Sequence, residues 1–234
     1  MKENNFLNLN FKFFFVTPYL NWLSFIIFYI FNSELIKAGE LDGFIKYGND
    51  SSTYLTYAKQ LTNFDFSNLD ILKLSYIFLI AIVIFLKLNL TTVIILQFIT
   101  TIISSFCLYL MGKRMFSKWV GLLCLSFFLT YLPIQLRNFY LLTEMFFINF
   151  SIILTYFVFF NKEKKILILL IAIFLLFLRP NGFLILLSIS LPIFMFSKFN
   201  KNYNFTLKIF TIFSFLFLLL FFLNFGINDY NFIQ

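Results

Sequence analysis

The sequence of 234 residues contains no histidine, and it has only two cysteines, four prolines and seven glycines. Without histidine, the chain can form neither a Ser-His-Asp triad nor a histidine-ligated metal site. Cys107 and Cys124 lie inside apolar runs, so we expect neither a disulfide framework nor a CxxC motif. The glycines are scattered along the sequence, which argues against a glycine-rich phosphate-binding loop.

Charged residues are also scarce, at 12% of the sequence, whereas 61% of the residues are hydrophobic. The mean hydropathy is +0.92. In a soluble domain, by contrast, about a quarter of the residues are charged. The apolar residues form long runs such as 210–225, which contains no charge, and a helix of about 20 such residues spans a bilayer. Strands of a membrane barrel would alternate apolar with polar residues, and these runs do not. The sequence therefore predicts an all-α, polytopic transmembrane helical bundle that forms a single domain over residues 1–234.

Eight apolar runs follow one another, at about 13–31, 74–86, 91–111, 119–133, 145–160, 166–178, 183–197 and 208–225. The first run is too long for the core of a signal peptide and has no small-residue cleavage site, so we expect an uncleaved first helix over 13–32. The net charge of +8 comes mostly from basic residues in the loops between runs. That distribution is typical of membrane orientation, and we expect no nucleic-acid partner.

The basic loops predict the sidedness of the chain. Under the positive-inside rule they lie in the cytoplasm together with the N-terminus. The first helix leaves the cytoplasm and the loop at 113–118 lies back inside it, so one of the two intervening runs must not span. We favour 74–86, which is short and is flanked by lysines. The three basic loops are Lys113, Arg114 and Lys118; Lys162, Lys164 and Lys165; and Lys198, Lys201 and Lys208.

This topology predicts about seven spanning helices, with the C-terminus outside. Residues 33–90 would form an outer loop with juxtamembrane helices, and residues 91–225 would hold the remaining helices. The alternative is that every run spans, which would place all three basic loops outside.

Three polar segments then lie on the outer side. In the first, Asp50-Ser51-Ser52 precedes Tyr54, Ala58 and Leu61, whose spacing is that of one face of an interfacial helix. A purely structural interpretation makes Asp50 or Ser51 a helix N-cap and Tyr54 an interfacial anchor.

The second segment holds Arg137 and Thr143-Glu144, and the third is Arg179-Pro180-Asn181-Gly182. Thr143 could simply cap the next helix, with Glu144 favoured by its positive end. Arg179 could simply snorkel beside a turn, or its guanidinium could bind a phosphate headgroup.

Because the topology puts these segments on one side, Asp50, Glu144 and Arg179 could converge on a single outer cavity. Carboxylates orient or deprotonate a hydroxyl, and an arginine stabilises a departing phosphate. This is chemistry suited to glycosyl transfer from a lipid phosphate.

At these residues the chain resembles the membrane glycosyltransferases of the GT-C class, which include the protein O-mannosyltransferases and the aminoarabinose transferases. The stretch GNDSSTYLTYAKQL is similar to their first outer loop. The segment from LYLMGKRMF to LLTEMFF has the same order of features as these enzymes: a helix, a basic turn, a second helix, a proline, an arginine and Thr-Glu. The stretch FLRPNGFLIL is similar to their Arg-Pro-x-Gly turn. The order holds over about residues 14–200.

The resemblance implies a polyprenyl-phosphate sugar as donor and an active site that faces the periplasm or exterior of a plasma membrane. Asp50 would be the catalytic carboxylate and Glu144 the second acidic position. The residues expected to bind substrate are Tyr54, Arg137, Arg179 and Asn181. We predict no cofactor and assign no metal ligands, although a divalent cation is compatible with the acidic outer loop.

The chain departs from the family in two ways. It has no His-Pro-Pro or Tyr-Pro-Pro ahead of the run at 74–86, where it reads Lys73-Leu74-Ser75-Tyr76. It is also shorter than full-length relatives, which is compatible with a partner subunit. The alternative is a non-catalytic membrane protein: a lipid-linked sugar flippase or transporter, an accessory subunit or an inactive fragment.

A transporter is expected to carry polar residues near the middle of the membrane. The main polar set inside the runs is Gln97, Thr100, Thr101, Ser104 and Ser105. These side chains could form helix–helix contacts as readily as a path.

Overall fold

The computed structural model describes residues 2–32, 48, 50–66, 70–161, 163–179 and 181–197. Within these ranges the chain is helical and contains no β-strand, which confirms the predicted all-α class. The helices are α1 Lys2–Asn32, α3 Ser51–Thr62, α4 Leu74–Phe85, α5 Thr91–Met115, α6 Lys118–Thr130, α7 Leu132–Leu136, α8 Glu144–Phe160, α9 Lys165–Leu176 and α10 Gly182–Ser197, with the short 3₁₀ helices η1 Ile71–Lys73 and η2 Arg137–Phe139. Each predicted run up to residue 197 is helical, although the run at 119–133 is divided between α6 and α7. The run at 208–225 lies outside the described residues.

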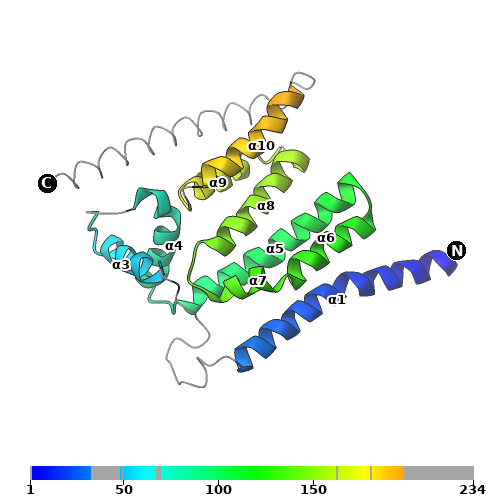
Figure 1. The fold of residues 1–234 in the computed structure, drawn as a ribbon, viewed down its shortest axis with the longest axis horizontal. Coiled ribbons are helices and arrows are strands. Elements are labelled where there is room, and N and C mark those ends of the chain that lie inside the picture. Colours follow the sequence, from blue (N-terminus) through cyan, green and yellow to red (C-terminus); the bar gives the residue numbers. More distant parts are fainter. Residues whose placement is uncertain are drawn as a thin grey trace.

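Helix α5 lies at the centre of the bundle (Figure 1). It packs against α6 and α8, while α1 lies along α6, and α9 and α10 cover α8 on the opposite side. Helices α3 and α4 pack on each other beside the beginning of α5. They therefore lie at the same end of the bundle as α7, and the short loop between α5 and α6 lies at the opposite end (Figure 1).

Local sequence explains the close pairing of α5 with α6. Ser117 caps α6, because its hydroxyl accepts a hydrogen bond from the Val120 amide at 3.3 Å. Gly112 and Gly121 then let the two backbones touch: a Cβ on Gly112 would lie 2.7 Å from the Gly121 Cα. Small residues at a helix crossing allow this approach in membrane bundles.

A proline accounts for the bend between α6 and α7. Helices α6 and α7–η2 meet at 53° around Tyr131, and Pro133 lies in the first turn of α7. A proline lacks the amide hydrogen needed inside a continuous helix and is tolerated in a first turn. The bend turns the segment that carries Arg137 across the end of the bundle.

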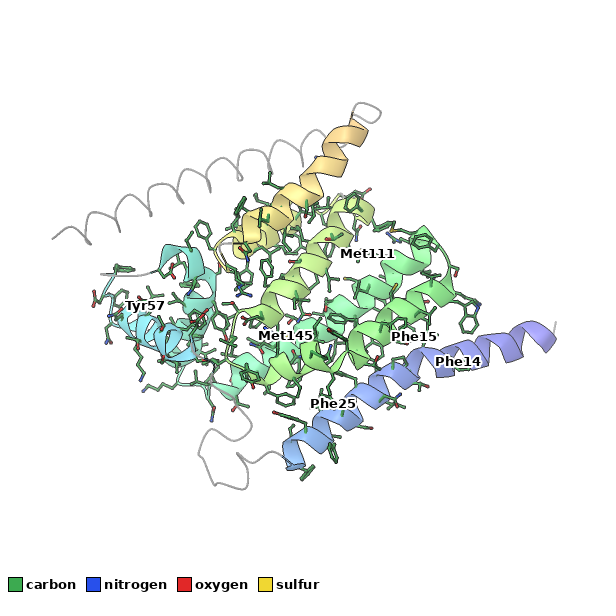
Figure 2. All side chains as sticks on the ribbon, viewed as in Figure 1. Phe14, Phe15, Phe25, Tyr57, Met111 and Met145 are labelled. Atoms are coloured by element: carbon green, nitrogen blue, oxygen red, sulfur yellow. The ribbon has the colours of Figure 1, made fainter. Side chains whose placement is uncertain are left out.

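Buried side chains form two apolar clusters. The larger joins α3, α4, α5, α8, α9 and α10, and the smaller joins α1, α5, α6 and η2. Figure 2 shows Phe15 of α1 directed toward the bundle, where its ring centroid lies 4.8 Å from that of Tyr109 on α5. Met145, also labelled there, is fully buried at the beginning of α8.

Apolar side chains also cover much of the outer surface. Along α5, the exposed residues Ile95, Ile99, Ile102, Ile103 and Phe106 recur at the spacing of one helix face. Exposed apolar surface of this extent marks contact with lipid or with another protein. Two helices, Phe14–Phe31 and Thr91–Met115, are long and apolar enough to cross a membrane, and the bent pair Lys118–Thr130 with Leu132–Phe139 would make a third. The described part of the chain therefore has two or three helices that could span a bilayer.

Candidate active site

Three segments that are far apart in the sequence meet at the end of the bundle that holds α3 and α4. The Ser51 hydroxyl donates a hydrogen bond of 2.8 Å to the Leu141 carbonyl, which joins α3 to the segment before α8. The Ser75 amide donates to the Phe177 carbonyl at 2.9 Å, which joins α4 to the turn before α10. The polar segments predicted to share one side of the membrane thus lie together in space.

A cavity of about 340 Å³ opens in this region, beside the bend between α6 and α7. Its volume is within the range of small-molecule binding sites. One part of its wall is apolar and aromatic, and the other holds two guanidinium groups and one carboxylate. The lining residues are Tyr131, Pro133, Ile134, Arg137, Glu144, Phe147, Ile148 and Arg179.

Glu144 lies between the two arginines. Its Oε1 is 3.3 Å from Nη2 of Arg179 and 3.9 Å from Nη1 of Arg137. The Arg179 guanidinium also lies over the Phe147 ring, 5.9 Å from its centroid. The other carboxylate oxygen of Glu144, Oε2, is buried and accepts no hydrogen bond from the described residues. The cavity therefore combines concentrated positive charge with a carboxylate that has unused acceptor capacity.

Asp50 lies at the N-cap position of α3, as predicted, but its side chain makes no capping hydrogen bond. Its Oδ2 instead lies 3.4 Å from the Tyr54 hydroxyl and 4.0 Å from Nζ of Lys73. Lys73 also faces Asp70, at 3.7 Å. The Asp50 side chain is 57% exposed, so the carboxylate is accessible to a molecule that approaches this end of the bundle.

Tyr54 connects Asp50 to the cavity that Glu144 lines. The interpretation of Tyr54 as an interfacial anchor is wrong, because the residue is only 2% exposed and its ring packs edge-on against Tyr76 at 5.1 Å. Burial raises the pKa of the Tyr54 phenol to about 12, an effect that hydrogen bonding by Thr143 partly offsets. The carboxylates of Asp50 and Glu144 contribute to this rise in pKa, and the Arg179 guanidinium opposes it. The phenol is therefore a neutral hydrogen-bond donor in the field of both acids.

The structure brings together most, but not all, of the predicted site residues. Arg137, Glu144 and Arg179 share the cavity wall, while Asp50 and Tyr54 lie to the side of it. Asn181 is exposed in the turn before α10, where its carbonyl accepts from the Leu184 amide, and its side chain does not line the cavity. Thr143 occupies the N-cap position of α8 but makes no capping hydrogen bond.

Sequence reasoning missed Lys73 as a member of this site. Its ammonium group lies between Asp50 and Asp70 and 5.4 Å from the centroid of the Tyr54 ring. The only sequence signal was its spacing of three residues from Asp70, which predicts a local ion pair but not the contact with Asp50.

The polar residues inside the apolar runs form contacts between helices. Thr101 of α5 donates to the Asn138 side chain of η2 at 2.9 Å, and Ser104 donates to Asn149 of α8 at 2.7 Å. Asn149 returns hydrogen bonds to Thr100 and Thr101. Because these groups satisfy one another, they act as links between helices rather than as an open polar path.

No group of three or more acidic or cysteine side chains comes together as a metal site within the described ranges. Comparisons with family models, with curated proteins and with solved structures find no match to this chain.

Proposed function

We propose that this chain is a multi-pass membrane glycosyltransferase of the GT-C type. It transfers a sugar from a polyprenyl-phosphate donor to a lipid, glycan or protein acceptor on the outer face of the plasma membrane. The proposal rests above all on one observation: Glu144 and two arginines line a cavity at the end of an apolar helical bundle, beside an exposed carboxylate of Asp50. Carboxylates for the acceptor and guanidinium groups for a phosphate are the groups that this reaction requires.

The proposed orientation has seven crossings, with the N-terminus in the cytoplasm. The basic residues Lys113, Arg114 and Lys118 lie at the end of the bundle opposite α3 and α4, as an inner face requires (Figure 1). Helix α9 has only 12 residues, about 18 Å of helix against about 30 Å of hydrocarbon. In a seven-crossing bundle, local thinning of the bilayer and the residues that flank α9 would have to make up this difference.

The proposed reaction is a substitution at the anomeric carbon of the sugar. The acceptor oxygen forms a bond to that carbon while the bond from the carbon to the phosphate oxygen breaks. The proton of the acceptor hydroxyl goes to the Asp50 carboxylate, and the leaving polyprenyl phosphate takes the electron pair. Arg137 and Arg179 offset the charge that develops on that phosphate, and the neutral Tyr54 phenol orients Asp50 through its hydrogen bond.

The test is sugar transfer in membranes supplied with labelled polyprenyl-phosphate sugars. We expect the native chain to transfer the label and Asp50→Asn to lose transfer by a factor of about 100 or more, because the change keeps the size of the side chain but removes its basicity. The matched control is Asp65→Asn, an exposed aspartate shortly after the same helix, which should retain native transfer.

Misfolding is a poor explanation for such a loss, because Asp50 is largely exposed and its ion pair with Lys73 is long, at 4.0 Å. Native transfer by Asp50→Asn would remove the residue from the reaction. No transfer by the native chain from any donor tested would argue against the enzyme itself.

A further inference from the structure

The backbone between η2 and α8 is held by side chains from two different helices. Residues 140–142 leave η2 with an extended Tyr140, at φ −92° and ψ 138°, and then bend toward α8. Their three consecutive carbonyl groups all accept hydrogen bonds from buried side chains. The Gln97 amide donates to the Tyr140 and Leu142 carbonyls at 3.2 Å each, and the Ser51 hydroxyl donates to the Leu141 carbonyl at 2.8 Å.

The two donors come from different helices. Gln97 lies on α5 and Ser51 on the first turn of α3, and both side chains are fully buried. A side-chain amide has two hydrogens to donate, and Gln97 uses both on this one segment. Ser51 in turn accepts a hydrogen bond from the Gly48 amide at 2.8 Å, which ties the residues before α3 to the same point. A displacement of the segment would break all three bonds, and it would leave the buried Leu141 carbonyl without its partner.

The held segment lies between the two acids of the proposed site. Thr143 and Glu144 follow it directly, and Asp50 directly precedes the Ser51 that holds it. Leu142 also packs against Gly48, where a Cβ would lie 2.8 Å from the Leu142 Cδ1. The position of Glu144 relative to Asp50 is therefore set by contacts of residues 140–142 rather than by any contact between the two acids.

We propose that Gln97 and Ser51 are positioning residues: they clamp residues 140–142 and thereby fix the spacing between Asp50 and Glu144. This inference rests on the proposed function for its catalytic consequence, but the clamp itself is a structural claim. Neither residue touches the groups that react. A displacement of about 1 Å at a reacting group can cost a factor of about 100 in rate, so donors that hold residues 140–142 in place would matter for catalysis.

A disulfide between residues 48 and 142 measures the clamp directly. The close contact of a Gly48 Cβ with the Leu142 side chain brings the two positions within the range of a disulfide. The variant Gly48→Cys with Leu142→Cys would be made after Cys107 and Cys124 are replaced by alanine. Its rate of oxidation would be compared in three backgrounds: native, Gln97→Met and Ser104→Ala.

Gln97→Met keeps the length of the side chain and removes both donors. Ser104→Ala is the matched control, because Ser104 is an equally buried residue of α5 whose hydrogen bond goes to Asn149 instead. We expect oxidation to be about tenfold slower in the Gln97→Met background, in line with the loss of two hydrogen bonds, and unchanged in the Ser104→Ala background. An equal rate in the native and Gln97→Met backgrounds would overturn the clamp.

Transfer kinetics, measured without the engineered cysteines, test the catalytic consequence separately. We expect Gln97→Met to lower kcat by about 10- to 100-fold with little change in KM, and Ser104→Ala to retain the native kcat. If the native chain transfers no sugar, the proposed function fails and the oxidation rates alone decide on the clamp. If Gln97→Met does not fold, Ser51→Ala removes the donor that α3 supplies. It should also slow oxidation, and a native rate in that variant would contradict the proposal.

Discussion

Replacement of Arg179 should cost more stability than replacement of Arg137, although both guanidinium groups face the same carboxylate of Glu144. The two distances are 3.3 Å for Arg179 and 3.9 Å for Arg137. At an effective dielectric constant of about 20, the Coulomb energies are about 5 and about 4 kcal/mol. Distance alone therefore separates the two pairs by only about a fifth.

Exposure to solvent decides the difference. The Arg179 side chain is 34% exposed and that of Arg137 is 54% exposed, while Glu144 is only 19% exposed. Water screens the Arg137 pair more strongly, and its side chain has more freedom to lose. After desolvation and screening, we expect a coupling free energy of about 1–2 kcal/mol between Arg179 and Glu144, and of no more than about 0.5 kcal/mol between Arg137 and Glu144.

A double-mutant cycle measures these couplings. The free energy of unfolding would be determined in mixed detergent micelles for Glu144→Gln, Arg179→Gln, Arg137→Gln and the two double variants. The control is Arg114→Gln, because Arg114 lies at the other end of the bundle and donates to the Phe160 carbonyl at 3.0 Å; it should show no coupling with Glu144. Coupling that is equal for both arginines, or absent for Arg179, would refute the argument from exposure.

Two further predictions concern orientation and protonation. Single cysteines at the exposed positions Ser52 and Asn181 should react with a membrane-impermeant reagent from outside intact cells, whereas one at the exposed Ser117 should be protected; labelling of Ser117 from outside would contradict the proposed sidedness. The phenol of Tyr54 should titrate at about pH 12 rather than about pH 10. The measurement is the difference in phenolate absorbance between the native chain and Tyr54→Phe as the pH is raised. Because its pKa is raised on folding, its contribution to stability is present below pH 10 and is lost as the pH rises toward 12, so titration near pH 10 would contradict its burial.

Hydrophobic patterning alone predicted most of the helices. Runs such as 91–111 and 145–160 became α5 and α8 with ends that differ by a few residues, because an apolar run of this length has few alternatives to a helix once water is excluded. The bend at Tyr131 was harder to foresee, since the run 119–133 contains no interruption before Pro133.

The candidate site was predictable only in part. Arg137, Glu144 and Arg179 stood out because charges are rare in this sequence, and the structure places all three around one cavity. The pairing of Asp50 with Lys73 and the burial of Tyr54 were not foreseeable. Both depend on how α3 folds back onto α4, and a spacing of i, i+4, i+7 does not reveal which partner covers a helix face.

The sequence by itself determined that the described chain is helical and apolar, because composition and run length act locally along the chain. Tertiary structure alone decided what the polar residues do. In the sequence, Gln97 is one member of the polar set in the run at 91–111. Only the packing of α5 beside residues 140–142 directs both of its amide hydrogens to the Tyr140 and Leu142 carbonyls. Hydrogen bonds and ion pairs act over about 3–4 Å, so their partners are fixed only once distant segments have been brought together.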